Sequence, residues 1–428
     1  MIPPRPVTTP ETQRSPAAER PPLRVLVLGH TAVLGGAELA LARLLAGLDA
    51  TQVQAEVLLF SAGPLAERLS SADVPVTVLP LRDDLVQLSR TGLLRRPDVT
   101  VAAVGALLRY VGTLRTEIRR RRPDLVVTNS LKSAVLGGAA ARMARVPWVW
   151  HLHDRLSADY LPGPAAGLLR LLARTGPRLV VVNSRDTAAR LGRQPSGRVV
   201  VGYPGLPADA FSSGAGPSSG PATSRVIGML GRISQTKGQL EFVRAAAAVA
   251  ATHPDVTFRI IGRALFNDQP YAEELGALVA ELHLESRIEL VGWAPDPTAA
   301  LGGLTAVVHA SPVPEPFGQV VVEAMAANVP VVATLAGGVG EILDPDQEVG
   351  SVAPGTAVRT AYGQLVAPGD VAGLAAALTW LLEHPAEATE LAGRARSQAA
   401  ERFRIETTAE VVIAAWRRAG GGRSTQDS

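Results

Sequence analysis

Short, almost wholly apolar segments alternate with helical ones along this chain, and this alternation restricts its fold more than any other feature. In the first half, RVLVLG (24–29) is followed by a Gly-Gly turn and a helical segment, and PDLVVTNS (123–130) and RLVVVNS (178–184) continue the series. Strands with so few polar residues are typical of parallel sheets that are covered by helices on both faces. The pattern therefore predicts an α/β fold.

The same alternation begins again after a segment of different composition. Residues 205–224, GLPADAFSSGAGPSSGPATS, consist mainly of Gly, Ser, Pro and Ala, which is typical of a linker. RVIGMLG (225–231) then opens a second series of apolar segments. Because 428 residues exceed what one hydrophobic core usually covers, we predict two doubly wound α/β domains, 23–204 and 225–402, facing each other across a cleft.

The two ends of the chain differ from these domains. A helical segment at 403–418 follows the second series, and we expect it to pack back toward the first domain. Residues 1–22 are polar and rich in proline, without the apolar core of a signal peptide, so we expect a disordered tail there and another at 419–428. The chain has no cysteine and no apolar run of about 18 residues, so we expect a cytoplasmic protein that does not span a membrane.

Charge is distributed unevenly between the halves. Residues 1–200 contain 27 Lys and Arg against 15 Asp and Glu, whereas residues 201–428 contain 15 against 24. A solvated Arg-rich surface explains the positive charge of the first half as well as an anionic partner does. Such a partner would be an anionic or lipid-linked acceptor, or the inner face of a membrane. The four arginines at 119–122 complement a helix C-terminus, which is the simpler explanation of that run. The basic half lacks interleaved aromatic residues and any recognisable module for nucleic acid.

A turn with two cations opens the second domain. GMLGRISQTKGQ (228–239) leads from the first strand into a helix, and it carries Arg232 and Lys237. The free N–H groups and the dipole of a helix N-terminus favour anions, and a guanidinium beside an ammonium suits a diphosphate. An ordinary connection with surface charges is the alternative. Lys237 is one of only two lysines in the chain, the other being Lys132.

Two carboxylates lie close together later in the same domain. In HASPVPEPFGQVVVEAMAANVPVVATLAGGVGEI (309–342), Glu315 precedes a Pro-Phe-Gly turn and Glu323 lies about one turn inside the predicted helix that follows. Both side chains would surround one helix N-terminus, where they could accept hydrogen bonds from sugar hydroxyls. The spacing alone is weak, since glutamate is common on helices.

Three of these segments together resemble glycosyltransferase family 4. GRISQTKG, then EPFGQVVVE, then PVVATLAGGVGE carry the resemblance, which runs from about Arg24 to the last helix. The family consists of retaining transferases that use sugar nucleotides, and its GT-B fold has two Rossmann-like domains. The resemblance implies a nucleotide-diphosphate sugar donor, UDP- or GDP-linked, an acceptor hydroxyl, and neither a cofactor nor a metal ion.

The resemblance also assigns roles to residues of the second domain. Arg232 and Lys237 would hold the donor diphosphate and act in catalysis. Glu323 would bind the nucleotide ribose, and Glu315 would contact the donor sugar together with the backbone around Phe317 and Gly318. Two departures affect the donor pocket: residues 343–370 form a longer connection than usual, and Asn328 stands where the family often has glycine.

The first domain supplies the rest of the expected site. Gly35 and Gly36, in GHTAVLGGAEL, match the glycine loop whose backbone N–H groups approach the donor phosphates. His153, in WHLHDR, matches the position that hydrogen-bonds the donor sugar near its reacting carbon, whereas His151 is expected to pack inward. Lys132 follows another strand, where it would face the acceptor or lie at the surface.

Other classes of protein fit the sequence less well. The sequence argues against a dinucleotide oxidoreductase, because the first turn lacks the G-x-G-x-x-G pattern and no acidic residue ends the second strand. A glycoside hydrolase would not need the diphosphate-binding cations. A sugar-nucleotide 2-epimerase of the same architecture and a non-catalytic sugar-nucleotide-binding protein stay open as alternatives to a retaining transferase.

Overall fold

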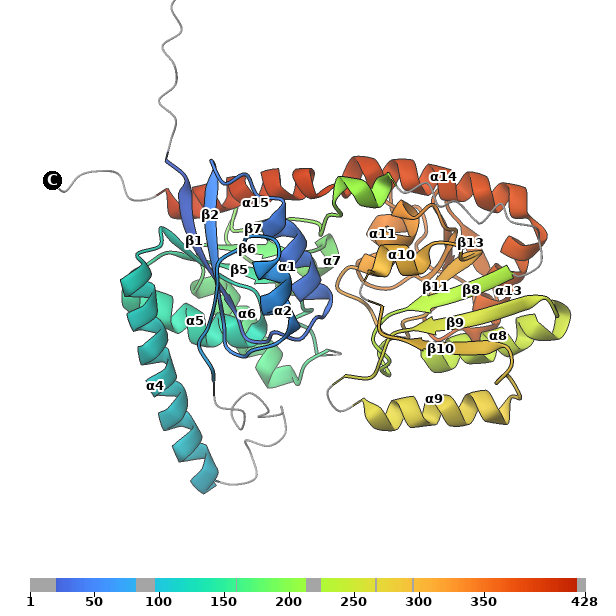
Figure 1. The fold of residues 1–428 in the computed structure, drawn as a ribbon, viewed down its shortest axis with the longest axis horizontal. Coiled ribbons are helices and arrows are strands. Elements are labelled where there is room, and N and C mark those ends of the chain that lie inside the picture. The colour runs from blue at the N-terminus through green and yellow to red at the C-terminus, as the bar shows by residue number, and fades with distance from the viewer. Residues whose placement is uncertain are drawn as a thin grey trace, which may run out of the picture.

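Two parallel sheets form two lobes that lie side by side (Figure 1). The computed structural model describes residues 21–81, 97–158, 160–212, 225–265, 268–294 and 296–421. Within these residues each sheet has seven strands, and helices connect most successive strands. The prediction of two Rossmann-like α/β domains is therefore confirmed. The expected tails at 1–22 and 419–428 and most of the expected linker at 205–224 lie outside the described residues, apart from their edges.

The first sheet is wholly parallel, with the strand order β3-β2-β1-β4-β5-β6-β7. The order reverses between β1 and β4, and in doubly wound sheets such a switch point opens a crevice at the carboxyl ends of the strands. The strands are β1 (Leu23–Gly29), β2 (Val53–Leu59), β3 (Val76–Val78), β4 (Leu125–Thr128), β5 (Trp148–Leu152), β6 (Leu179–Val182) and β7 (Val199–Val201).

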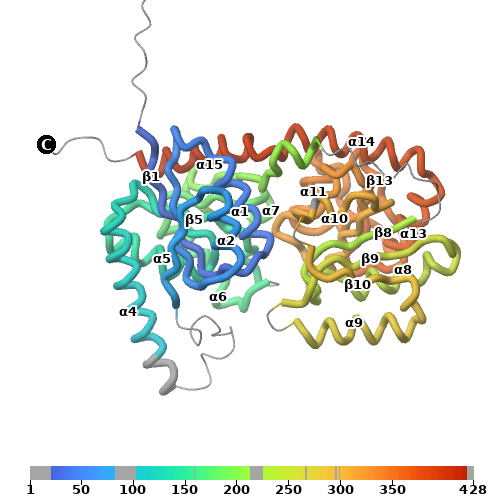
Figure 2. Tube along the Cα trace, in the orientation of Figure 1, coloured from blue at the N-terminus to red at the C-terminus, as the bar shows by residue number. Residues whose placement is uncertain are grey.

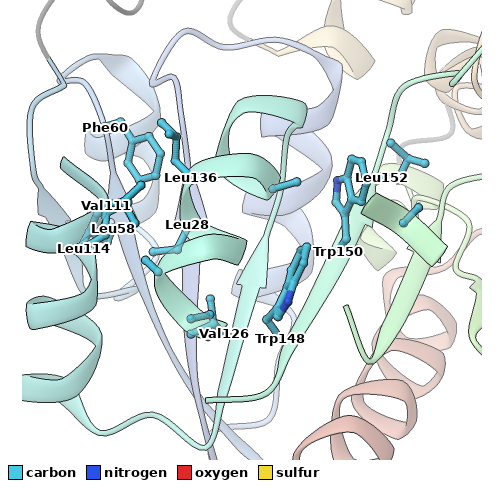
Figure 3. Close-up of a cluster of buried hydrophobic side chains, with 14 of the residues drawn as sticks. Leu28, Leu58, Phe60, Val111, Leu114, Val126, Leu136, Trp148, Trp150 and Leu152 are labelled. Carbon is cyan, nitrogen blue, oxygen red and sulfur yellow. The ribbon is translucent and has the colours of Figure 1, made fainter. Parts of the chain in front are cut away.

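Alternate side chains of these strands face two separate hydrophobic layers, as the period of two requires. One layer packs Leu28, Val126 and Trp150 against helices α4, α5 and α6 (Figure 3). The other packs Val27 and Val127 against α1, α2 and α15. The helices of this lobe are α1 (Gly36–Ala46), α2 (Pro64–Ser70), α4 (Pro97–Arg121), α5 (Leu131–Ala144), α6 (Gly163–Thr175) and α7 (Arg185–Arg190).

The second sheet repeats this plan, with the order β10-β9-β8-β11-β12-β14-β13. Its strands are β8 (Arg225–Leu230), β9 (Val256–Ile261), β10 (Ile288–Gly292), β11 (Ala306–His309), β12 (Val331–Thr334), β13 (Ala357–Arg359) and β14 (Gln364–Val366). Its helices are α8 (Gln239–Thr252), α9 (Gln269–Glu281), α10 (Pro297–Leu301), α11 (Gln319–Ala326), α12 (Val339–Leu343), α13 (Val371–Glu383) and α14 (Pro385–Arg402).

The long connection at 343–370 forms the outer edge of this sheet. Its strand β13 pairs antiparallel with β14, so the segment ends in a hairpin. Asn328, which follows α11, has a φ of 58°. This left-handed conformation is one that glycine adopts freely and asparagine tolerates better than most residues, so the substitution keeps the turn.

Two crossings of the chain join the lobes. The backbone of Leu206 in the first crossing donates to Phe403 O and accepts from Ile405 N in the second, both at 2.8 Å. A short 3-10 helix, η1 (Ala208–Phe211), follows the first crossing. Helix α14 covers the second lobe, and α15 (Ile405–Gly420) continues it along the first, so the two helices run across both lobes (Figure 2).

Helix α15 completes the interior of the first lobe. Its Trp416 is fully buried, and the indole Nε1 donates a hydrogen bond to Nε2 of His151 over 2.9 Å. Burial, and then the neighbouring His153, lowers the pKa of His151 to about 3. A neutral ring that accepts from an indole is a structural group, and His151 points away from the cleft into this layer.

Candidate active site

A cavity of about 470 Å³ lies between the lobes, at the carboxyl ends of strands from both sheets. Residues from the ends of β1, β4 and β5 line it on one side, and residues from the ends of β8, β9 and β11 line it on the other. All nine residues predicted for donor binding or catalysis are in the lining: Gly35, Gly36, His153, Arg232, Lys237, Glu315, Phe317, Gly318 and Glu323. The described lining contains neither Lys132 nor any residue of 343–370.

The predicted cationic turn enters the cavity between β8 and α8. Arg232 Nη1 lies 3.3 Å from Asp268 Oδ2, and Lys237 forms an ion pair with Glu315. Gln239, the first residue of α8, is fully buried and its amide donates to the carbonyl of Arg232 at 2.9 Å. This hydrogen bond fixes the turn from behind, so both cations are held toward the cavity.

Glu315 lies in a strongly polar contact. Besides the ion pair with Lys237, its Oε2 lies 3.4 Å from Nε2 of His309, at the end of β11. Burial alone raises the pKa of Glu315, but the charge of Lys237 and the contact with His309 outweigh it and hold that pKa well below the usual range. The carboxylate is therefore ionised, and it faces a cavity in which it can accept hydrogen bonds.

The Gly337–Gly338 pair explains how the Glu315 loop keeps its shape. Gly337 has a φ of 67°, and a Cβ there would lie 2.0 Å from the carbonyl oxygen of Glu315. A Cβ on Gly338 would lie 2.6 Å from the carbonyl oxygen of Pro316, and Gly338 N donates to Glu315 O at 2.8 Å. The loop and the turn are in contact through their backbones, which leaves no room for a side chain.

Glu323 makes an ion pair with the other lobe. Its Oε1 lies 2.7 Å from Nη2 of Arg43, in α1, and the two side chains are only 6% and 9% exposed. Gln319, one turn earlier in α11, donates to the carbonyl of Gly36 at 2.8 Å. These contacts join α1 and α11 at one end of the cavity. Arg43 was not predicted from the sequence, because no local motif marks it and its partner lies in the other lobe.

His153 is held as a neutral ring. Its Nε2 lies 3.0 Å from the amide oxygen of Asn129, and burial lowers its pKa to about 4. Because an amide oxygen can only accept, Nε2 carries the proton and Nδ1 is left as an acceptor. A neutral imidazole at this position can orient a hydroxyl group without adding positive charge.

Glu38 is a second residue that the sequence analysis missed. It lies in the first turn of α1, and its carboxylate folds back over Gly35, toward the backbone N–H groups of Gly35 and Glu38. Burial is the main reason that the pKa of Glu38 is raised to about 7, with the charge of Asp154 adding to it. The capping-box position of Glu38, three residues after Gly35, was the available signal.

Aromatic groups lie at two other places around the cavity. Phe317 is 2% exposed and packs against Tyr203 and Phe403, with ring centroids 5.8 and 5.7 Å apart, so the loop after Glu315 is anchored at both chain crossings. Trp293, by contrast, is 38% exposed, and the guanidinium of Arg263 lies 5.3 Å from the centre of its ring. An exposed indole in a cavity wall offers a flat apolar surface.

Two Rossmann-like lobes with a cation-bearing cavity between them form the GT-B architecture. Two family models match the chain, "Glycosyl transferase 4-like domain" over residues 35–205 and "Glycosyl transferases group 1" over residues 217–401. The chain is thus a glycosyltransferase of the family 4 type, and the resemblance seen in the sequence is confirmed.

Named relatives and solved structures agree with this assignment. The chain is 29% identical to 2-deoxystreptamine glucosyltransferase of Streptomyces kanamyceticus, over 79% of this chain and 89% of that protein. It is 28% identical to D-inositol 3-phosphate glycosyltransferase of Kineococcus radiotolerans, over 74% and 76% of the two chains. The crystal structure of Anabaena Alr3699/HepE in complex with UDP-glucose matches 92% of this chain and 98% of that chain, with 28% identity and a TM-score of 0.73.

Proposed function

We propose that this glycosyltransferase moves a sugar from an α-linked UDP-sugar to an acceptor hydroxyl with retention of configuration. A GDP-sugar is the second choice of donor. The observation that carries the proposal is the convergence of Arg232, Lys237 and Glu315 from one lobe and His153 from the other on a single cavity. The complex of the Anabaena relative with UDP-glucose supports the choice of UDP.

In the proposed reaction, the bond between the anomeric carbon and the diphosphate oxygen breaks, and the acceptor oxygen bonds to that carbon on the same face. The negative charge that grows on the leaving diphosphate is met by Arg232, by Lys237 and by the N-terminal amides of α8. Preorganised charge of this kind is usually the largest contribution to catalysis. The acceptor proton passes to the departing phosphate, so no separate base is required.

Other side chains hold the donor. Glu315 would accept hydrogen bonds from the sugar hydroxyls, and the neutral His153 would accept one through Nδ1. Glu323 would bind the ribose with the part of its carboxylate that Arg43 leaves accessible. Since Arg232 and Lys237 supply the positive charge, we propose that transfer needs no metal ion, and turnover should be the same with and without EDTA.

The experiment that tests this function has two stages. A thermal-shift screen of UDP- and GDP-sugars identifies the donor, because a ligand that binds the native state raises the unfolding midpoint by mass action. NMR of the products formed with a panel of hydroxyl acceptors then reports the new linkage. An α-linked product supports retention, and a β-linked product refutes it. Release of a 2-epimer would instead indicate an epimerase, and tight binding without any product would indicate a non-catalytic binder.

Glu38 predicts how donor affinity depends on pH. Its carboxylate lies over Gly35, beside the glycine turn that we propose for the donor phosphates, so an ionised Glu38 repels the donor and a protonated one does not. With a pKa of about 7, the wild-type enzyme should lose affinity for UDP-sugar between pH 6 and pH 8. The loss is at most about tenfold, since linkage to one titrating group allows no more over this interval.

The matched variant is Glu38→Gln, which removes the charge and keeps the shape. Its dissociation constant for UDP-sugar, measured by calorimetry at both pH values, should be nearly constant. A diphosphate diester has no proton to lose in this range, so the donor adds no slope of its own. An equal slope in the variant and the wild type would contradict the assignment.

We further propose that the first lobe contacts the inner face of a membrane, where an anionic or lipid-linked acceptor would be found. Helices α4, α5 and α6 cover one face of the first sheet, and Leu108 and Leu168 are each 67% exposed, close in sequence to the exposed Arg109 and Arg174. Exposed apolar side chains beside arginines suit an anionic lipid surface. No helix among the described residues is long and apolar enough to cross a bilayer.

The arginine run at 119–122 contributes less to this surface than its sequence indicates, because Arg121 pairs with Glu56 at 2.6 Å and also with Glu117. Flotation with vesicles tests the proposal. The enzyme should float with vesicles that contain acidic lipid and not with neutral ones, and Leu108→Glu with Leu168→Glu should abolish flotation. Equal recovery on both kinds of vesicle would refute it.

A further inference from the structure

A buried carboxylate of the second lobe accepts hydrogen bonds from the first lobe. Glu341, in α12, is 8% exposed. Its Oε2 accepts from the backbone N–H of Arg185 and from the hydroxyl of Tyr203, both at 2.8 Å, and its Oε1 accepts from the N–H of Asp186 at 2.7 Å. Arg185 and Asp186 begin α7 of the first lobe, and Tyr203 precedes the first crossing. One side chain thus makes three hydrogen bonds to the opposite lobe.

The same end of α7 also holds the loop that follows Glu315. Ser184 caps α7 through Thr187 N at 2.9 Å, and its hydroxyl donates to the carbonyl of Pro316 at 2.5 Å. The hydroxyl of Thr187 lies 3.3 Å from the same carbonyl oxygen. The start of α7 is therefore fixed both to α12 and to the backbone beside Glu315.

Two connections lead from α7 to His153. Thr187 donates to Asn183 Oδ1 at 2.9 Å, and the amide of Asn183 donates to the carbonyl of His153 at 3.4 Å. Asp186, whose N–H is bound by Glu341, pairs through Oδ2 with Nε of the buried Arg155 at 2.8 Å. Arg155 lies two residues after His153, so both connections reach the same short segment.

Glu341 is also connected to Glu315, through the backbone of the Gly337–Gly338 turn. It lies at the end of the turn that begins with Gly337 and Gly338, whose backbones contact the backbones of Glu315 and Pro316. A displacement of α7 relative to α12 would thus change the separation of His153 and Glu315 directly. These two residues lie on opposite lobes of the cavity.

We propose that Glu341 is a positioning residue, which sets the two lobes so that His153 and Glu315 contact the same donor sugar. The inference rests on the proposed function, and Glu341 itself does not touch the substrate. A carboxylate is required, because all three partners are donors. A glutamine would turn its NH₂ group toward at least one of them and leave a buried donor unpaired.

The direct test is Glu341→Gln, assayed with the donor found in the screen. We expect kcat for transfer to fall roughly tenfold or more, since a displacement of about 1 Å in an active site can cost a hundredfold. The dissociation constant of UDP should stay within about twofold, because nucleotide-binding groups in the second lobe are untouched. Hydrolysis of the donor should rise relative to transfer as the lobes seat less closely.

Two further variants separate positioning from loss of structure. Tyr203→Phe keeps the ring against Phe317 and removes only one of the three hydrogen bonds, so it should show a smaller effect in the same direction. Glu387→Gln is the matched control, because Glu387 is an exposed glutamate of the second lobe that pairs with Arg359 at 3.2 Å, and its kinetics should be unchanged. If kcat of Glu341→Gln stays normal, or if UDP affinity falls in parallel with kcat, the proposal is wrong.

Small-angle X-ray scattering tests the same inference without turnover. Glu341→Gln should have a larger radius of gyration than the wild-type chain under identical conditions, and an unchanged radius would overturn the proposal. If the wild-type chain transfers no sugar from any donor, the proposed function fails instead. The scattering comparison still decides then whether Glu341 sets the lobes.

Discussion

Lys237→Ala is expected to lower turnover with any donor at least about a hundredfold, as the loss of one preorganised group that stabilises transition-state charge typically does. The reason is the place of the ammonium in the cavity, next to Arg232 and in an ion pair with Glu315. Its removal takes away charge that the leaving diphosphate needs, and it leaves a buried carboxylate without its cation. The measurement is kcat with saturating donor and acceptor.

Arg259→Ala is the matched control for Lys237→Ala. It removes a cation from the same lobe, but Arg259 is 45% exposed and pairs with Glu289 at the surface, so its kcat should be unchanged. A near-normal kcat for Lys237→Ala would refute the assigned role.

The loss of stability in Lys237→Ala should also depend on pH. The folded pKa of Glu315 lies below its unfolded value of 4.5, so in the wild type the ion pair stabilises the fold above that pH. This contribution is lost as the pH falls through the folded pKa. The deficit of Lys237→Ala in denaturant melts should therefore be largest near neutral pH and shrink in acid.

Gly337→Ala is expected to lower turnover by roughly a hundredfold, because it acts on the backbone that holds Glu315. The added Cβ would lie 2.0 Å from the carbonyl oxygen of Glu315, where contacts below 3.0 Å force a displacement. The loop must therefore move by about 1 Å, and a misplacement of that size in an active site can cost about two powers of ten. The left-handed φ of 67° adds strain of about 1–2 kcal/mol for any residue other than glycine.

Gly350→Ala gives the matched control for Gly337→Ala. Gly350 lies in the same lobe, and a Cβ there would meet nothing within 4 Å. It should keep full activity and stability. The dissociation constant of UDP, measured for both variants, completes the comparison. A normal kcat for Gly337→Ala would show that the Glu315 loop does not depend on the glycine pair.

Much of this architecture could be predicted from local sequence, because a buried parallel strand needs an apolar run and a βα turn needs glycine or a cap. RVLVLG and RVIGMLG each open a lobe as expected, and the arginine run at 119–122 lies at the C-terminus of a helix, α4 (Pro97–Arg121), as expected. Lys237 and Glu315 could be predicted as site residues because each belongs to a short continuous motif, whose residues also lie together in the folded structure.

What the sequence could not predict depends on contacts between the lobes. Arg43 and Glu323 are 280 residues apart in the sequence, and no motif near Arg43 marks it as the partner of Glu323. Glu341 likewise has no local signal, because its partners include backbone N–H groups of α7 that come near it only after folding. Neither pattern nor composition encodes such pairs, and only the closed arrangement of the two sheets brings them together.

Helix α15 links the completion of the first lobe to the synthesis of the second. Trp416 and Ile413 of α15 enter the interior of the first lobe, although the whole second lobe separates them from it in the sequence. Since domains generally fold as they emerge from the ribosome, the part of the first sheet that α15 covers stays exposed while the second lobe is translated, and only α1 and α2 cover that face until then. Chaperones would bind that apolar surface in nascent chains, and a chain truncated before Ile405 would expose it permanently.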